Sequence, residues 1–184
     1  MTRAPGDESV EAVDADGRVE GIVTRRDMRA GNLRHRATFV VVRNSRDEVL
    51  VHERAPWKDI WPSRWDVAFG GVCGVGESWA EAATREVMEE AGFTAELVDL
   101  GPVRFESDET RVVGRVFAAE HDGPATFPDG EVVGHAWIPV ADLAAWAATH
   151  ELCDDSAAVV LPSYLERVGL SRQPDPQPTQ GSPK

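Results

Sequence analysis

Residues Gly71 to Phe93 read GVCGVGESWAEAATREVMEEAGF. Within this stretch Glu89 and Glu90 follow Glu86 by three and four positions, so a helix through it carries all three carboxylates on one face. Like charges at this spacing repel and cost an isolated helix roughly 0.2–0.5 kcal/mol per pair. Carboxylate oxygens are the ligands that Mg²⁺ and Mn²⁺ prefer. The pattern therefore indicates a helix that binds divalent cations.

The local sequence predicts where this helix begins and ends. Ser78 and Glu81 form the S-x-x-E pattern of a capping box, which places the first helical residue at about Trp79. Gly92 follows the apolar pattern and can adopt the left-handed conformation that ends a helix. The residues expected to contact the core, away from the acidic face, are Ala80, Ala83, Val87 and Ala91.

Nine positions of this stretch resemble a complete Nudix box, the signature of the Nudix hydrolase superfamily: Gly71-x5-Glu77-x7-Arg85-Glu86-Val87-x-Glu89-Glu90-x-Gly92-Phe93. The resemblance implies an α/β fold of the Nudix type, an α/β/α sandwich with a mixed β-sheet between helices. It also implies an enzyme, a hydrolase that cleaves a diphosphate (P–O–P) linkage by water attack on phosphorus. The substrate class implied is a small molecule built on a nucleoside diphosphate.

The resemblance further implies a site for Mg²⁺ or Mn²⁺. Arg85 would hold neighbouring carboxylates in place without binding metal, and Glu77 would either pair with Arg85 or act as an outer metal ligand. Bound cations would neutralise the diphosphate charge and lower the pKa of a bound water. The implied inner ligands are Glu86, Glu89, Glu90 and the carbonyl of Gly71.

The sequence leaves open which carboxylate accepts the proton from water. One candidate is Glu89 or Glu90 within the box. The other is Glu131, at the start of a predicted strand that ends in Trp137-Ile138-Pro139. A general base must lie within hydrogen-bond reach of the water, and spacing along the chain does not establish that.

Basic and aromatic residues before the box are candidates for substrate contacts. Arg54, Lys58 and Arg64 flank an aromatic loop at residues 55–64 and suit phosphate contacts, and Trp57 suits stacking on a base. An earlier basic cluster could meet substrate phosphates or the acidic groups of an oligomer partner. For most of its members we favour a solvated face of a short helix: Arg25, Arg26, Arg29, Arg34, His35 and Arg36.

The composition is that of a globular and strongly acidic chain. Of its 184 residues 42% are hydrophobic, and its formal net charge is −13 with a pI of about 4.7. This charge argues against binding to nucleic acid or to anionic membranes, and no apolar run reaches the roughly 20 residues of a membrane span. Cys73 and Cys153 fit no metal-binding spacing and are expected to be reduced thiols of a cytoplasmic protein. A homodimer is compatible with the resemblance.

The pattern predicts one Nudix domain over residues 10–170, between a disordered N-terminal tail at 1–9 and a disordered proline-rich tail at 171–184. Apolar periodicity and turn residues predict the secondary structure. We expect a hairpin at 10–23, a helix at 24–31, strands at 36–43, 48–54, 65–69, 94–106, 111–121 and 131–138, and helices at 140–150 and 156–168, the last broken near Pro162.

Two other functions are weighed against hydrolysis. The segments RHRATF and WPSRWD are similar to isopentenyl-diphosphate isomerase, but the reactive Cys and the adjacent His of that enzyme fall on Gly70 and Val72 here. Its later acidic pair falls at about Thr110 and Val112, although Glu106 and Glu109 are close enough for the alignment to shift. Only His35 matches a metal ligand. A sensor that binds a diphosphate without cleaving it is the other alternative. The intact set of glutamates favours the hydrolase.

Overall fold

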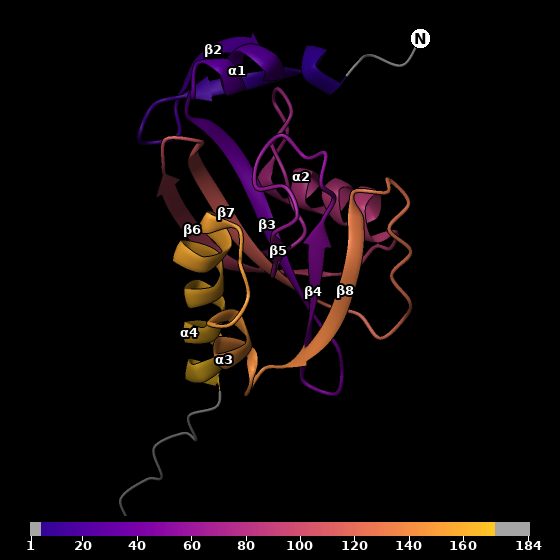
Figure 1. Ribbon diagram of the computed structural model, residues 1–184. Helices are drawn as coiled ribbons and strands as arrows, with labels where there is room; N and C mark the ends of the chain where they lie inside the picture. The colour runs from indigo at the N-terminus through magenta and orange to yellow at the C-terminus, as the bar shows by residue number, and fades with distance from the viewer. Residues whose placement is uncertain (1–4, 172–184) are drawn as a thin grey trace, which may run out of the picture.

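The computed structural model describes residues 5–171, in which a mixed β-sheet lies between two groups of helices (Figure 1). The box helix α2, Trp79–Glu86, packs on one face, and α4, Leu161–Ser171, packs on the other. This is the α/β/α sandwich that the resemblance implies, so the fold class is confirmed. The strands are β1 Ser9–Val13, β2 Val19–Thr24, β3 His35–Arg43, β4 Glu48–Arg54, β5 Trp65–Asp66, β6 Leu97–Glu106, β7 Arg111–Glu120 and β8 Val132–Pro139.

The alternation of side chains along β3 builds a core on each face of the sheet. Phe39 and Val41 join the core that includes Leu161 of α4, whereas Val40 and Val42 join the core under α2. Every residue from 37 to 42 is buried, which explains why this part of the strand is apolar apart from Thr38 and rich in β-branched residues.

The centre of the sheet is a parallel pair. β3 and β7 run side by side from His35 opposite Val112 to Arg43 opposite Glu120. The pairs β1–β2, β4–β8 and β6–β7 are antiparallel, so the sheet is mixed.

The predicted hairpin of β3 with β4 forms only next to its turn, where Arg43 pairs with Val49. Beyond that pair the strands separate, because the segment that follows β5 enters between them. Single bridges join Phe69 and Val72 of this segment to β3. The strand predicted at 65–69 is therefore too long, since regular pairing stops after β5.

The N-terminal hairpin and the short helix after it are present as predicted. Thr24 caps α1, Arg25–Ala30, by accepting a hydrogen bond from the Asp27 N–H. The prediction of disorder is wrong for residues 5–9, because a 3-10 turn and the first residue of β1 lie there. The predictions for residues 1–4 and 172–184 fall outside the described residues.

The box helix begins as its capping box predicts and ends at Gly92, whose φ is 77°. Its last turn, Val87–Ala91, is a π-helix, which the apolar pattern did not predict. Ala80 is exposed, so its predicted core contact is wrong. The helical residues that are buried on the core side are Ala82, Ala83, Val87 and Ala91.

The first C-terminal helix is shorter than predicted, and the second is longer and continuous. α3 spans only Leu143–Ala147 of the helix predicted at 140–150. A π-helical turn at Ser156–Val160 leads directly into α4, so the helix is not interrupted near Pro162. A wider turn before a proline is one way to accommodate its ring and its missing N–H. Within residues 5–171, no helix combines the length and apolar character needed to cross a bilayer.

Candidate active site

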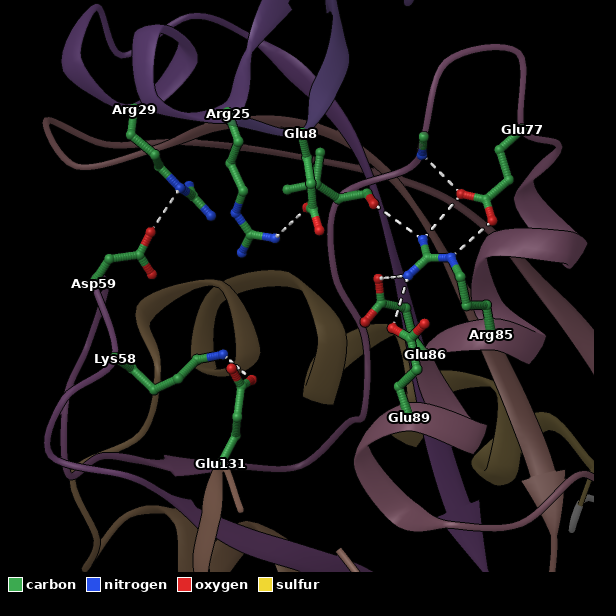
Figure 2. Close-up of polar contacts among 12 residues, drawn as sticks. Glu8, Arg25, Arg29, Lys58, Asp59, Glu77, Arg85, Glu86, Glu89 and Glu131 are labelled. Atoms are coloured by element: carbon green, nitrogen blue, oxygen red, sulfur yellow. Dashed lines mark hydrogen bonds and ion pairs between the residues drawn. The ribbon is translucent and has the colours of Figure 1, made fainter. Parts of the chain in front are cut away.

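A cleft of about 1320 Å³ lies between α1, the aromatic loop at 55–64, the glycine-rich segment at 70–76 and the box helix. Its border includes the three box glutamates Glu86, Glu89 and Glu90, and from other elements Asp129 and Glu131. Figure 2 shows that the charged side chains of these separate elements converge on this space. The cleft therefore collects most of the residues that the sequence singles out.

Arg85, in the last turn of α2, is the centre of a hydrogen-bond network. Its Nη1 donates to Glu86 Oε1 at 2.7 Å and to Glu89 Oε2 at 3.1 Å. Its Nη2 also donates to the carbonyl of Val72 at 3.3 Å. The guanidinium thus holds two box carboxylates in fixed directions, as expected for a residue that positions metal ligands.

Glu77 anchors this arginine from the other side. Both carboxylate oxygens of Glu77 accept hydrogen bonds of 2.9 Å from Arg85, and Oε2 also accepts one of 2.7 Å from the Gly74 N–H. The hydrogen bonds from Arg85 lower the pKa of Glu77 despite partial burial. The geometry matches the role of partner to Arg85, one of the two roles considered for Glu77.

Glu86 and Glu90 are buried, whereas the Glu89 side chain is 55% exposed. Burial raises the pKa of Glu90 well above its usual value, and the nearby Glu86 carboxylate adds to this effect. Burial also raises the pKa of Glu86, against the opposing effect of Arg85. Burial makes these two neighbouring carboxyl groups costly to ionise. A cation that binds between them would favour the ionised form of both.

The glycines before the helix let these carboxylates approach the backbone. The Gly70 N–H donates to Glu90 Oε2 at 3.0 Å. A Cβ on Gly71 would lie 2.6 Å from Glu86 Oε1, so only glycine leaves room for that carboxylate. The Gly71 carbonyl accepts a hydrogen bond from the Thr38 N–H at 3.0 Å, which leaves one lone pair for another partner.

A second acidic pair, Asp129 and Glu131, joins Glu90 from the turn just before β8. One carboxylate oxygen from each of Glu90, Asp129 and Glu131 can be chosen so that all three lie within 4.8 Å of one another. Burial raises the pKa of Asp129. Asp129 was missed in the sequence analysis, although its position two residues before Glu131 could have identified it. An all-oxygen set of this kind fits a hard divalent cation such as Mg²⁺ or Mn²⁺.

Three of the four predicted substrate contacts border the cleft, and the fourth does not. Arg54 is largely buried, with Nη2 donating to the Ile60 carbonyl at 3.2 Å and Nη1 4.0 Å from Asp66. Lys58 pairs with Glu131, and Trp57 is exposed at the border. Arg64 lies elsewhere, because its guanidinium bonds to the Leu152 carbonyl and to Asp154.

The earlier basic cluster divides into two groups. Arg34 pairs with Glu106, and Arg36 pairs with Glu11 and lies over the Trp79 ring. The arginines of α1, in contrast, border the cleft, which the favoured interpretation of a solvated face did not anticipate: Arg25, Arg26 and Arg29.

The positions that correspond to isomerase chemistry do not support it. A Cβ on Gly70 would lie 1.9 Å from the Thr38 carbonyl oxygen, so this backbone has no room for a cysteine there. Cys73 and Cys153 are free and buried, and burial raises the pKa of the Cys73 thiol to about 12. His35 is also buried, and its Nδ1 lies 3.0 Å from the Leu33 carbonyl. These residues therefore lack the reactive thiol that the isomerase reaction needs.

Comparison with known proteins agrees with this geometry. A family model described as NUDIX domain matches residues 33–156. An uncharacterised Nudix hydrolase of Shigella flexneri, YfcD, is 34% identical over 144 residues, which are 78% of this chain and 80% of the relative. The crystal structure of DR0079 from Deinococcus radiodurans has a TM-score of 0.69 at 24% identity, covering 90% of this chain and 100% of that one.

A further solved structure, the NUDIX domain of Shewanella oneidensis NrtR in complex with ADP ribose, has a TM-score of 0.60 at 17% identity. It covers 73% of this chain and 88% of that one. At these identities the two solved structures establish only the fold. The match to the family model and the identity to YfcD establish more: the chain belongs to the Nudix hydrolase family.

Proposed function

We propose that this protein is a metal-dependent pyrophosphohydrolase that cleaves the P–O–P linkage of a nucleoside diphosphate joined to another group. The observation that carries the proposal is the convergence of Glu90 from the box helix with Asp129 and Glu131 from the start of β8. Lys58 lies against this cluster, so ligands for cations and a cation for phosphate occupy the same part of the cleft.

The residues that would hold Mg²⁺ or Mn²⁺ border this part of the cleft: Glu86, Glu89, Glu90, Asp129 and the carbonyl of Gly71. When bound, the cations supply charge neutralisation at the diphosphate and lower the pKa of water. Arg85 keeps Glu86 and Glu89 oriented for this purpose, and Glu77 keeps Arg85 oriented in turn.

Glu131 is the general base that this arrangement favours. Glu90 is buried and receives the Gly70 N–H, so it is held as a ligand. Glu89 accepts a hydrogen bond from Arg85. Glu131 is paired with Lys58, and a substrate phosphate that binds Lys58 would release the Glu131 carboxylate to accept a proton from water.

The cleft has room for a substrate of nucleotide size. Its volume of about 1320 Å³ exceeds the roughly 300–1,000 Å³ of ordinary small-molecule pockets. Trp57 is 65% exposed at the border and offers a ring for stacking on a base. The ADP ribose bound by the Shewanella domain supports the same substrate class. We place the activity in the cytoplasm, where two free cysteines ordinarily stay reduced.

A substrate screen tests the proposal. The purified protein would be incubated with nucleoside di- and triphosphates, nucleotide sugars and dinucleotides, with Mg²⁺, Mn²⁺ or EDTA, and released phosphate or nucleotide would be measured. We expect metal-dependent cleavage that falls at least about 100-fold in Glu90→Gln and in Glu131→Gln. Glu96→Gln, at an exposed glutamate outside the cleft, is the matched control.

Three outcomes would count against the proposal. Normal turnover by a folded Glu90→Gln protein would remove the metal assignment. Tight binding of a diphosphate in Mg²⁺ without cleavage would support the sensor. Exchange of deuterium from solvent into isopentenyl diphosphate would restore the isomerase.

A further inference from the structure

The short helix α1 extends two arginine side chains toward the cleft from a different side than the box helix (Figure 2). Arg25 and Arg29 are four residues apart, so they share one face of α1. Their side chains are only 28% and 22% exposed. Two half-buried positive charges on one helix face need a counter-charge, which either a ligand in the cleft or a neighbouring residue can supply.

Their existing partners use little of their capacity. Arg25 Nη1 is 3.7 Å from Glu8 Oε2, which is beyond hydrogen-bond distance. Arg29 Nε is 3.3 Å from Asp59 Oδ2 but makes no hydrogen bond within the described residues, and Arg29 Nη1 donates to Thr110 Oγ1 at 3.3 Å. A guanidinium has five N–H donors. Both arginines therefore retain donors for an anion.

Arg85 provides a comparison, because its guanidinium uses its hydrogen-bonding capacity fully. Its guanidinium makes five hydrogen bonds between 2.7 and 3.3 Å, two of them to one carboxylate. The contacts of Arg25 and Arg29 are fewer and longer, and their carboxylate partners Glu8 and Asp59 are 54% and 51% exposed. Exposed and loosely held counter-ions contribute little to stability, so a ligand can displace them easily.

We propose that Arg25 and Arg29 bind a second anionic group of the substrate, a phosphate monoester separate from the diphosphate that is cleaved. This inference rests on the proposed function, because it places the diphosphate at the metal end of the cleft. Two guanidinium groups match the geometry and the double charge of a phosphate monoester. A single carboxylate of a substrate carries one charge and would leave more of their N–H donors unused.

The contacts of Arg29 differ from those of the two cations nearer the acidic cluster. Lys58 lies at the acidic cluster with Glu131, and Arg54 Nη1 is 4.0 Å from Asp66 Oδ2. Arg29 instead contacts Thr110 at the turn between β6 and β7. The cleft volume of about 1320 Å³ leaves room for both sites in one substrate.

Pairs of diphosphates that differ by a single phosphate monoester test the inference. NADPH against NADH and coenzyme A against dephospho-coenzyme A are such pairs. With Mg²⁺, we expect the wild type to prefer the phosphorylated member by about 10- to 100-fold in kcat/KM, mainly through KM. Arg29→Gln and Arg25→Gln should each reduce this ratio by about 10-fold or more.

Two further variants distinguish a specific contact from a general effect of charge. Arg26 also borders the cleft, but its side chain is 66% exposed and its Nη2 lies 2.7 Å from Asp7 Oδ1. Arg26→Gln removes the same charge from the same helix, and its ratio should stay nearer that of the wild type than the ratios of Arg25→Gln and Arg29→Gln. Asp59→Asn removes the carboxylate that competes with the ligand for Arg29. It should therefore raise the ratio of kcat/KM between the phosphorylated and unphosphorylated substrates. Absence of any preference in the wild type, or an equal loss for both members in Arg29→Gln, would overturn the inference.

A binding measurement separates failure of this inference from failure of the proposed function. Titration calorimetry without turnover would compare adenosine 2′,5′-bisphosphate with AMP. Tighter binding of the bisphosphate that is lost in Arg29→Gln supports the arginine site even if no diphosphate is cleaved. Equal affinity for the two ligands overturns it, whereas absence of cleavage with every diphosphate counts against the proposed function alone.

Discussion

Arg85 and Glu77 are joined by two hydrogen bonds of 2.9 Å, from Nε to Oε1 and from Nη2 to Oε2. The remaining nitrogen of the same guanidinium reaches Glu86 and Glu89. Because the guanidinium is planar and rigid, fixing one edge on Glu77 also fixes the direction of the N–H groups that hold the other two carboxylates. A residue outside the helix therefore determines the orientation of carboxylates within it.

Arg85→Lys tests this relationship, because it keeps the charge and removes the planar fork. We expect the affinity for Mg²⁺ and kcat each to fall about 10- to 100-fold, since Glu86 and Glu89 would no longer be held together. Metal titration by calorimetry and steady-state kinetics would measure both. Arg104→Lys, at an arginine that is 64% exposed, is the control. An Arg85→Lys protein with unchanged metal affinity would show that the network is not needed.

The close approach of Gly70 to β3 gives a second prediction. A Cβ at this position would lie 1.9 Å from the backbone oxygen of Thr38, and backbone cannot move aside as a flexible side chain can. Gly70→Ala should therefore lower the free energy of unfolding by about 3 kcal/mol or more, or prevent folding. Gly21→Ala, where no atom lies within 4 Å of the new Cβ, should change it much less. Equal stability of the two variants by urea unfolding would contradict this explanation.

The features of the site that depend on local sequence could be predicted. The capping bonds between Ser78 and Glu81 and the left-handed Gly92 are both determined by residues a few positions apart. The pairing of Arg85 with Glu77 was one of two roles that the box spacing left open. The strand 36–43 was recognisable because its residues 37–42 are buried and, apart from Thr38, apolar.

The features that depend on tertiary contacts could not be predicted. The parallel pairing of β3 with β7 and the entry of Phe69 and Val72 beside β3 follow from how distant segments pack. Asp129 joins Glu90 only because β8 begins near the box helix. The arginines of α1 look like a solvated helix face in sequence, and only the position of the N-terminal hairpin brings Arg25 and Arg29 to the cleft.

Asp155 at the cleft gives a prediction for alkaline pH. Burial, with a contribution from Asp66, raises the pKa of Asp155 from 3.8 to about 8. The native state therefore binds a proton that the unfolded state has lost between about pH 4 and 8, and stability decreases as the pH rises through this window. Asp155→Asn mimics the neutral acid and should raise the melting temperature at pH 8 by at least a few degrees, roughly 2–4 °C per kcal/mol, with little effect near pH 4.

Thermal unfolding at several pH values would measure this effect. Asp154→Asn changes the neighbouring residue, which is 47% exposed and pairs with Arg64, and it controls for the change in net charge. If Asp155→Asn followed the wild type across the whole range, the buried carboxyl group would not be responsible for the loss of stability.

His52 gives the opposite prediction, for acid pH. Its ring stacks on Phe69 at 4.4 Å and is 2% exposed, and burial lowers its pKa from 6.5 to about 4. The unfolded state therefore binds a proton that the native state does not, so stability is lost as the pH falls from about 6.5 to 4. The loss from this residue reaches at most about 3 kcal/mol.

His52→Phe keeps a buried ring and removes the titration. Compared with the wild type, its free energy of unfolding in urea should gain up to about 3 kcal/mol between pH 7.5 and pH 4.5, whatever its stability at pH 7.5. His135→Gln, at an exposed histidine, should show no such gain. Carboxylates elsewhere also respond to acid, but they are common to both proteins and cancel in the difference. If the difference in free energy of unfolding between His52→Phe and the wild type did not change with pH, His52 would become protonated equally readily in the native and unfolded states. Its burial would then not explain the loss of stability in acid.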